Sequence, residues 1–308
     1  MTIKPIRVEE LSSEHSPLQS LFWARSKAFL GWKPYAFEIN EEQQLLLLVR
    51  RLAPGFFFAY VPFGPSKSLN LEALSKEIKG HIPEPIFAIR YDLPFGSTKG
   101  GLKPLSYSIQ PQRTVQINVQ EPLAYRTRAR RALKKCANRY TLAYYDGHGH
   151  LFNQWYETYT TTAIRDSFAP RSKAYFLHLL SITEDRFVKP TLLLALEDTT
   201  VVGGVILLEG VNETIYLAGS STKEYVGYFL QDAAIQRTKE RGGKIYDLFG
   251  ISHEGEYLAS LDLFKQSFGG DVLTRPPSLD YPIYRLRYRI FTRLEKIRYR
   301  HSRSLRHG

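Results

Sequence analysis

The 308-residue chain is basic, with 42 Lys and Arg residues against 30 Asp and Glu, which gives a formal net charge of +12. Its 43% hydrophobic and 13% aromatic content excludes a mainly disordered chain, and its length suggests about two domains. The single cysteine, Cys136, excludes a disulfide framework and a Cys-rich zinc module. No apolar run reaches the roughly 20 residues of a membrane span, and the N-terminus lacks an apolar signal segment, so we expect a soluble cytoplasmic protein.

Apolar periodicity in the first half of the chain predicts alternating helices and strands. These elements are a helix over 17–30, strands over 35–39, 45–50 and 56–61, a helix over 69–79 and a strand over 86–90. Trp23 and Trp32 are expected in the core. A Pro- and Gly-rich loop follows over 92–106, and the run RTRARRALKKCANR over 126–139 is expected on a helix that opens near Glu121.

The second half predicts an order of elements that is typical of one domain type. We expect helices over 151–164 and 173–181, strands over 191–197, 201–208 and 214–219, a helix over 227–241 that ends at Gly242-Gly243, and a strand over 244–250. Two helices, an antiparallel meander of three strands, a helix and a strand form the order of a GNAT-type N-acyltransferase domain. A similar order in the first half suggests two copies.

The positive charge is concentrated in two segments. Residues 126–139 hold seven basic and no acidic residues, and residues 283–308 hold nine basic residues and one acidic residue, Glu295. Because the rest of the chain is close to neutral, this distribution indicates a polyanionic partner, which is a nucleic acid, an anionic lipid or a phosphorylated substrate.

The C-terminal segment also has the spacing of an amphipathic helix. Ile290, Leu294 and Ile297 share one face, and a basic stripe of four side chains lies beside it: Arg289, Arg293, Lys296 and Arg300. Two interpretations stay open. Either the helix docks by its apolar side with its arginines in water, or the cations contact the phosphates of tRNA or of a membrane surface.

Several common active-site motifs are absent. The chain has no phosphate loop, no GxGxxG after a strand, no HExxH and no GxSxG. The GHGH at 147–150 lacks a third ligand nearby and favours a plain loop, so no metal is predicted. Where an acetyltransferase holds the CoA pyrophosphate, EYVGYF at 224–229 places an acidic Glu224 and a bulky Phe229. Both oppose phosphate binding, so CoA is disfavoured and no cofactor is expected.

The most informative stretch is YDLFGISHEGEYLASLDLFKQSFGG over 246–270, in which a strand ends in Asp247 and a Phe264-Lys265 pair precedes a Gly-Gly turn. Further pieces follow the same pattern: LQSLFWARSKAFLGW at 18–32, YVPFGP at 60–65, IRYDLPF at 89–95, IRDSFAPRSKAYF at 164–176, GGVILL at 203–208 and IYLAGSS at 215–221. Together they resemble the FemABX peptidyltransferases, which transfer an amino acid from aminoacyl-tRNA to the stem peptide of a peptidoglycan precursor.

The resemblance implies an α/β fold of mixed sheets in two tandem GNAT-like domains. The first, precursor-binding domain is expected over 1–145 plus 283–308, with the basic C-terminal helix packing back on it. The second, over 146–282, would hold the end of the aminoacyl-tRNA and the catalytic lysine. The chain leaves no room for the coiled-coil arm of larger members, so it resembles the compact FemX-like members.

The resemblance also implies roles for particular residues. Lys265 matches the cation near the reacting ester, and Phe264 its aromatic neighbour at the tRNA 3′ end. Lys27 matches a lysine on the precursor's diphosphate and Arg171 its partner, with Arg165 within reach of the same motif. Asp92 occupies an RxD position and is one candidate for the proton acceptor, beside the tRNA ribose hydroxyl and water. Candidate tRNA or anionic-surface contacts are Arg128, Arg131, Lys134 and Lys135 with the basic stripe of the tail.

The chemistry of an aminoacyl ester fits these residue types. The ester is already activated, so its aminolysis needs positioning more than a strong base. A fixed ammonium such as Lys265 stabilises the oxyanion of the tetrahedral intermediate. Two cations suit a diphosphate, the arginine through a bidentate contact. Asp247 is expected to cap or brace its loop, and Phe249 stands where the family usually has a second glycine.

The leading hypothesis is therefore a monomeric, cytoplasmic aminoacyltransferase that uses neither metal nor CoA. Its acceptor would be UDP-MurNAc-pentapeptide or lipid II, and peripheral contact with an anionic membrane is consistent with the tail. Two alternatives remain: another non-CoA N-acyltransferase acting on a small amine, a protein or a lipid, and a non-catalytic tRNA- or membrane-binding protein. The sequence leaves open the amino acid, the tRNA and the position on the stem peptide.

Overall fold

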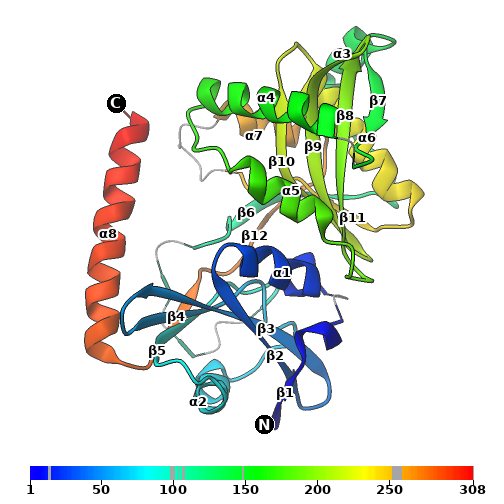
Figure 1. The fold of residues 1–308 in the computed structure, drawn as a ribbon. Coiled ribbons are helices and arrows are strands. Elements are labelled where there is room, and N and C mark those ends of the chain that lie inside the picture. The colour runs from blue at the N-terminus through cyan, green and yellow to red at the C-terminus, as the bar shows by residue number, and fades with distance from the viewer. Residues whose placement is uncertain are drawn as a thin grey trace. The chain divides into compact units, whose positions relative to one another are not determined.

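The computed structural model divides the chain into two compact units (Figure 1). Unit 1 comprises Met1–Ser12, Trp23–Gln110 and Arg275–Gly308, and unit 2 comprises Ser13–Phe22 and Pro111–Thr274. The structure describes residues 1–12, 15–97, 101–102, 104–105, 108–147, 149–251 and 259–307, with the side chains of 259 and 298–307 left out. The units therefore divide the chain at different points from the predicted domains. Strand β6 (Arg113–Asn118) is the reason, because it pairs with β11 and β12 of the second sheet.

Unit 1 is built on a six-stranded sheet of order β1-β2-β3-β4-β5-β13. Its antiparallel strands are β1 (Ile3–Ile6), β2 (Trp32–Ile39), β3 (Gln43–Ala53) and β4 (Phe56–Val61). Helix α2 (Leu71–His81) leads to β5 (Ile86–Tyr91), which runs parallel to β4, and β13 (Leu279–Pro282) closes the sheet. The Asn70 side chain caps α2 by accepting from the Ala73 amide at 3.0 Å. The apolar side of α2 packs with the buried residues of the sheet, among them Phe37, Leu47 and Ile89.

Helix α8 (Arg285–His307) packs on unit 1, as predicted for the C-terminal helix. The Phe291 ring stacks on Phe58 with centroids 5.0 Å apart and lies 5.1 Å from Phe87. Glu295 accepts from Arg90 at 2.7 Å. The docking side differs from the first interpretation of the tail, because Ile290, Leu294 and Ile297 are exposed to 41%, 61% and 65%.

Unit 2 is built on a seven-stranded sheet of order β12-β6-β11-β10-β9-β8-β7. The antiparallel meander consists of β7 (Thr141–Tyr144), β8 (Lys189–Glu197), β9 (Thr200–Glu209) and β10 (Glu213–Ser221). Helix α6 (Val226–Glu240) then leads to β11 (Ile245–Asp247), which is parallel to β10. The remaining strand is β12 (Asp271–Thr274), and the remaining helices are α3 (Thr127–Cys136), α4 (Gly149–Arg165), α5 (Lys173–Ser181) and α7 (Ala259–Gln266).

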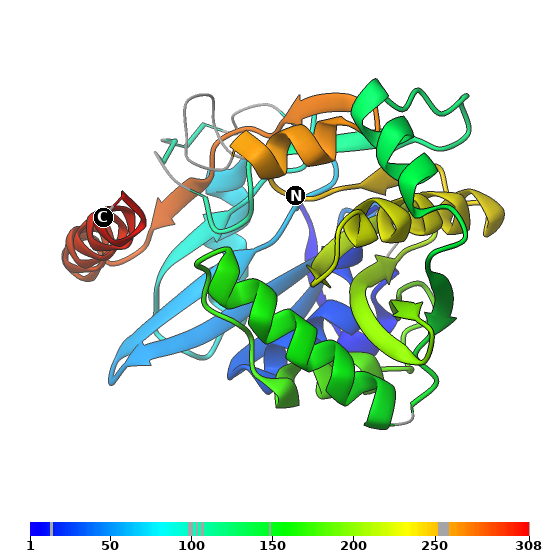
Figure 2. The same ribbon diagram turned by 90° about the horizontal axis from the view of Figure 1, so that it is seen from above.

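Helices α4 and α6 lie on opposite faces of this second sheet (Figures 1 and 2). Two successive glycines of β9 allow them to approach closely. A Cβ added at Gly203 would meet Val226 of α6, and one added at Gly204 would meet Trp155 of α4. Because neighbouring residues of a strand face opposite sides, the Gly203-Gly204 pair serves one helix on each face.

Both units thus contain an antiparallel meander followed by a helix and a parallel strand, which confirms the predicted α/β fold of two GNAT-like units. The predicted helix over 17–30 is divided into a 3₁₀ turn, Pro17–Gln19, and α1 (Leu21–Phe29). A second 3₁₀ turn is Val8–Glu10. Trp23 is buried as predicted, whereas Trp32 is partly exposed beside Tyr60, with ring centroids 6.1 Å apart.

Candidate functional site

Lys265 is a buried cation on α7 of unit 2, with only 5% of its surface exposed. Its ammonium donates to the carbonyl oxygens of Phe249 at 2.5 Å and Gly250 at 2.6 Å, and it lies 5.6 Å from the centroid of the Tyr216 ring. Burial lowers the pKa of Lys265 from 10.5 to about 8, while the charges of Asp247 and Asp262 act in the opposite direction. The two carbonyl oxygens and the burial of the side chain therefore fix the position of the Lys265 ammonium.

The loop after β11 supplies the two carbonyls that hold Lys265. Asp247 ends the strand fully buried, and its Oδ1 accepts from the Phe249 amide at 2.8 Å, so the predicted bracing role is confirmed. Gln116 of β6 donates to the other carboxylate oxygen at 3.0 Å. Phe249 and Gly250 both have left-handed backbone, with φ of 46° and 72°. A glycine adopts this conformation without penalty, whereas Phe249 holds it at a cost of about 1 to 2 kcal/mol that its contacts must offset.

Phe264 precedes Lys265 on α7 and belongs to a cluster of three aromatic rings. Its ring meets Tyr228 of α6 edge to face at 4.9 Å and Phe268 at 5.4 Å, and Tyr228 lies 5.6 Å from Phe268. Phe268 is fully buried, while Phe264 is only partly buried. The cluster therefore fixes the position of Phe264 and leaves part of its surface accessible.

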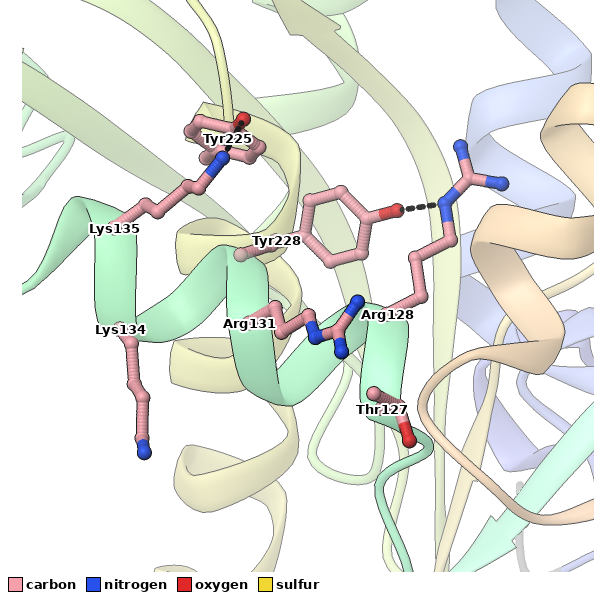
Figure 3. A pocket seen from close by; sticks show the side chains of 8 residues that line it. Thr127, Arg128, Arg131, Lys134, Lys135, Tyr225 and Tyr228 are labelled. Atoms are coloured by element: carbon pink, nitrogen blue, oxygen red, sulfur yellow. Dashed lines mark hydrogen bonds between the residues drawn. The ribbon is translucent and has the colours of Figure 1, made fainter.

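Helices α3 and α6 line an open pocket of about 680 Å³, which we call the basic pocket. Its lining residues are Thr127, Arg128, Arg131, Ala132, Lys134, Lys135, Tyr225 and Tyr228. Arg128 donates to the Tyr228 hydroxyl at 2.7 Å and Lys135 to the Tyr225 hydroxyl at 3.1 Å, whereas Lys134 points away from both rings (Figure 3). The lining contains four cations and no carboxylate, so it favours an anionic ligand. The same pocket reaches the aromatic cluster through Tyr228.

The two tyrosines of the basic pocket were not predicted from the sequence. Tyr225 precedes α6 in a left-handed conformation with φ of 65°, and Tyr228 follows one turn later. Within EYVGYF, Glu224 uses its carbonyl oxygen to accept from the Tyr140 hydroxyl at 2.8 Å, and Phe229 packs beside Tyr140 at 5.9 Å. The position of a usual CoA loop is thus occupied by aromatic packing. That no CoA binds stays a prediction.

The two motif arginines of unit 2 differ in their partners. Arg165 is paired bidentately with Asp166 at 2.7 and 2.9 Å and donates to the Ser221 carbonyl at 2.8 Å. Arg171 is exposed, its guanidinium lies 5.8 Å from the Tyr175 ring, and no carboxylate among the described residues pairs with it. Of the two, Arg171 is better placed to meet an outside anion.

The predicted residues of unit 1 have different surroundings. Lys27 of α1 is partly exposed, with its ammonium 4.0 Å from the centroid of the buried Trp23 ring. Asp92 is only 4% exposed and accepts from Tyr60 at 2.6 Å, from the Gln110 amide at 2.9 Å and from Ser278. Burial raises the pKa of Asp92 above its usual value. These contacts hold both carboxylate oxygens of Asp92 within unit 1, and its role in catalysis stays a prediction.

In the basic stripe of α8, the side chains of Arg289, Arg293 and Lys296 are exposed to solvent. The side chain of Arg300 lies outside the described residues. Of the GHGH segment, His148 also lies outside them, and His150 contacts Gln154 at 3.1 Å. Within the described ranges, no group of three His, Cys, Asp or Glu side chains could hold a metal ion. In the same part of the chain, no helix combines the length and apolarity needed to cross a bilayer.

A search of curated proteins finds no match to this sequence. Residues 193–296 match the FemAB family. The structure is similar to FemX at 16% identity over 94% of this chain and 99% of that chain, with a TM-score of 0.77. It is also similar to the C-terminal domain of a putative lysylphosphatidylglycerol synthetase from Agrobacterium fabrum, at 9% identity over 80% of this chain and 83% of that chain, with a TM-score of 0.53. L-PGS from Bacillus licheniformis is similar at 11% identity over 81% of this chain and 84% of that chain, with a TM-score of 0.52.

At these identities the solved structures establish the fold, which FemX shares over nearly its whole length. The fold is that of two GNAT-like units. The matched segment 193–296 contains the basic pocket's tyrosines, the Asp247 loop and the Phe264-Lys265 pair. Over residues 193–296 the chain is similar to the FemAB family, and its fold is similar to that of FemX.

Proposed function

We propose that this protein transfers an amino acid from aminoacyl-tRNA to an amine on the stem peptide of a peptidoglycan precursor, at the cytoplasmic side of the membrane. The observation that carries the proposal is the fixed ammonium of Lys265, which stands next to the partly accessible Phe264 ring in the segment matched by the family. Members of this family are transferases.

Lys265 is suited to stabilise an oxyanion. In the transfer, the acceptor nitrogen attacks the ester carbonyl, a C–N bond forms, and the C–O bond to the tRNA ribose breaks with its electron pair passing to the ribose oxygen. An ammonium has three N–H groups, and two of them donate to the carbonyls of Phe249 and Gly250, which leaves one for the transient oxyanion. With its pKa at about 8, Lys265 is mostly protonated at neutral pH.

The acceptor amine must lose a proton during the transfer. Asp92 belongs to unit 1, and both its carboxylate oxygens already accept hydrogen bonds from that unit. We therefore assign the proton to the departing ribose oxygen, directly or through water, and give Asp92 no part in the chemical step. This assignment keeps the atoms in balance, because the ribose leaves as a hydroxyl.

The basic pocket is suited to the single-stranded 3′ end of the tRNA. Its four cations can contact successive phosphates, and base stacking on aromatic rings is the common means of holding single strands. Tyr228 lines the pocket and also contacts Phe264, so one strand could follow the tyrosine to the ring beside Lys265. On the acceptor side, Lys27 and Arg171 are separate candidates for a phosphate contact with the precursor, each considered within its own unit.

The test is an assay of the purified chain with charged tRNA and the UDP-linked pentapeptide, read by mass spectrometry of the stem peptide. We expect an added residue, and Lys265→Met should lower its rate by about 100- to 1,000-fold. The matched control is Lys239→Met, which removes an exposed lysine at the end of α6. An equal rate in Lys265→Met and Lys239→Met would remove Lys265 from the mechanism.

The acceptor is the part of the proposal with a specific alternative. One protein of similar fold is named a putative lysylphosphatidylglycerol synthetase, which makes a lipid an acceptor worth testing. Repeating the assay with lipid II and with phosphatidylglycerol vesicles separates the two acceptors. Aminoacylated lipid without stem-peptide product would replace the peptidoglycan precursor as acceptor. Binding of charged and uncharged tRNA without product on any acceptor would favour a non-catalytic RNA-binding protein.

A further inference from the structure

Helix α8 of unit 1 carries three separate stripes of side chains along its length. The docking stripe includes Phe291 and Glu295 and contacts the sheet. The basic stripe is exposed and consists of Arg289, Arg293 and Lys296. The third stripe is apolar and exposed, with Leu286 at 72%, Ile290 at 41%, Leu294 at 61% and Ile297 at 65%.

The apolar stripe is continuous and largely exposed. Its members are separated by four, four and three residues, which places them on one helix face over a length of about 16 Å. The docking contacts come instead from Phe291, Glu295, Tyr288 and Arg287, the last two through Asp280 at 3.0 Å and the Gly55 carbonyl at 2.8 Å. Single exposed apolar residues are ordinary on a protein surface, whereas four in a row next to cations indicate a binding surface.

We propose that α8 binds to the surface of an anionic lipid bilayer, with the apolar stripe at the boundary of the acyl chains and the basic stripe on lipid phosphates. The two stripes lie side by side on the helix. This arrangement fits the membrane interface, because a helix lying there places its apolar and its charged side chains at about the same depth in the bilayer. RNA offers phosphates but no apolar phase, so it would leave four exposed Leu and Ile side chains without a function. The proposal concerns unit 1 alone and does not depend on aminoacyl transfer.

The test is co-sedimentation of the full chain with vesicles of phosphatidylcholine alone or mixed equally with phosphatidylglycerol. We expect binding to the anionic vesicles that weakens with salt and little binding to the neutral ones. Each basic residue near an anionic surface contributes a factor of about five, so Arg289→Gln, Arg293→Gln and Lys296→Gln combined should lower the binding by about 100-fold.

The apolar stripe is tested by a second variant, Leu286→Gln with Leu294→Gln and Ile297→Gln. It retains all the charges, and we expect at least a 10-fold loss of vesicle binding that persists at high salt. The matched control replaces three exposed cations of unit 2, Arg186, Lys189 and Lys239, by glutamine, and should retain vesicle binding to within a few-fold. Circular dichroism during heating checks that each variant folds.

Two results would overturn the proposal. One is vesicle binding of the apolar variant that equals that of the unaltered chain, since the stripe would then contribute nothing. The other is a dimer in sedimentation without lipid that the apolar variant converts to monomers, since a second copy would then cover the stripe. The tRNA and stem-peptide assay is run separately, so its outcome does not affect either result.

Discussion

The buried charge of Lys265 makes a prediction about stability that needs no substrate. Lys265→Met keeps the length of the side chain and removes its charge and its hydrogen bonds to Phe249 and Gly250. In the unfolded chain the lysine titrates near its ordinary pKa of 10.5, whereas burial lowers the pKa in the folded protein to about 8. Between these two values the unfolded chain binds a proton that the folded chain does not.

The sign and size of the effect follow from that difference. Raising the pH through this range stabilises the folded state, because the folded protein no longer holds a desolvated charge, whereas below pH 8 the unfavourable contribution is constant. A full shift of this size corresponds to about 3 kcal/mol, and the part gained between roughly pH 7 and pH 9.5 is about 2 kcal/mol. Other titrating groups contribute equally to both proteins and cancel on subtraction.

The measurement is the free energy of unfolding in urea at the two pH values, for the unaltered chain and for Lys265→Met. We expect the unaltered chain to gain about 2 kcal/mol relative to the variant as the pH rises. Lys239→Met, which removes an exposed lysine, should behave as the unaltered chain does. If the two free energies changed in parallel with pH, Lys265 would not be a buried charge with a lowered pKa, and its assignment as a fixed ammonium would be refuted.

Three further predictions concern other parts of the chain. Glu295→Gln weakens the link from α8 to Arg90 and should cost about 2 kcal/mol of unfolding free energy in urea; a change under a few tenths would show that this ion pair does not hold the helix. Gly270→Ala places a Cβ against the Gln116 carbonyl at a φ of 79°, so its melting temperature should fall by several degrees, more than that of a Gly→Ala change in open space. Tyr228→Leu should weaken binding of a single-stranded RNA about 10-fold in a filter assay, whereas Tyr228→Phe should change it little; equal losses would assign the effect to the hydroxyl that Arg128 contacts.

Local sequence patterns were sufficient for much of the fold. The meander and the α6 helix of unit 2 appear where apolar runs and the Gly242-Gly243 stop predicted them. Strand β6 could not be predicted in the same way, because its partners are far away in sequence: Gln116 lies opposite both Asp247 of β11 and Asp271 of β12. Such pairing depends on the assembled sheet, and it moves the boundary between the units from residue 145 to Gln110.

The candidate site was predictable where a motif carried it. The resemblance to the FemABX family indicated Lys265 and Phe264, and the structure adds that the lysine is buried and held by two carbonyls. The sequence alone does not single out Tyr225 and Tyr228, because EYVGYF is informative there only as the counterpart of a CoA loop. Their spacing of three residues on α6, opposite the basic face of α3, was the available signal, but it identifies a pocket only when the packing of the two helices is known.

The orientation of α8 shows where periodicity stops being informative. The pattern of the tail defines an apolar stripe and a basic stripe, yet neither of them docks. Arg90 decides the matter, because it is only 1% exposed and a buried guanidinium needs carboxylate partners. Asp280 supplies one, and Glu295, the single acidic residue of the tail, supplies the other. The face that carries Glu295 must therefore turn toward the sheet, and Leu286, Ile290, Leu294 and Ile297 are left on the outside as a consequence of that ion pair.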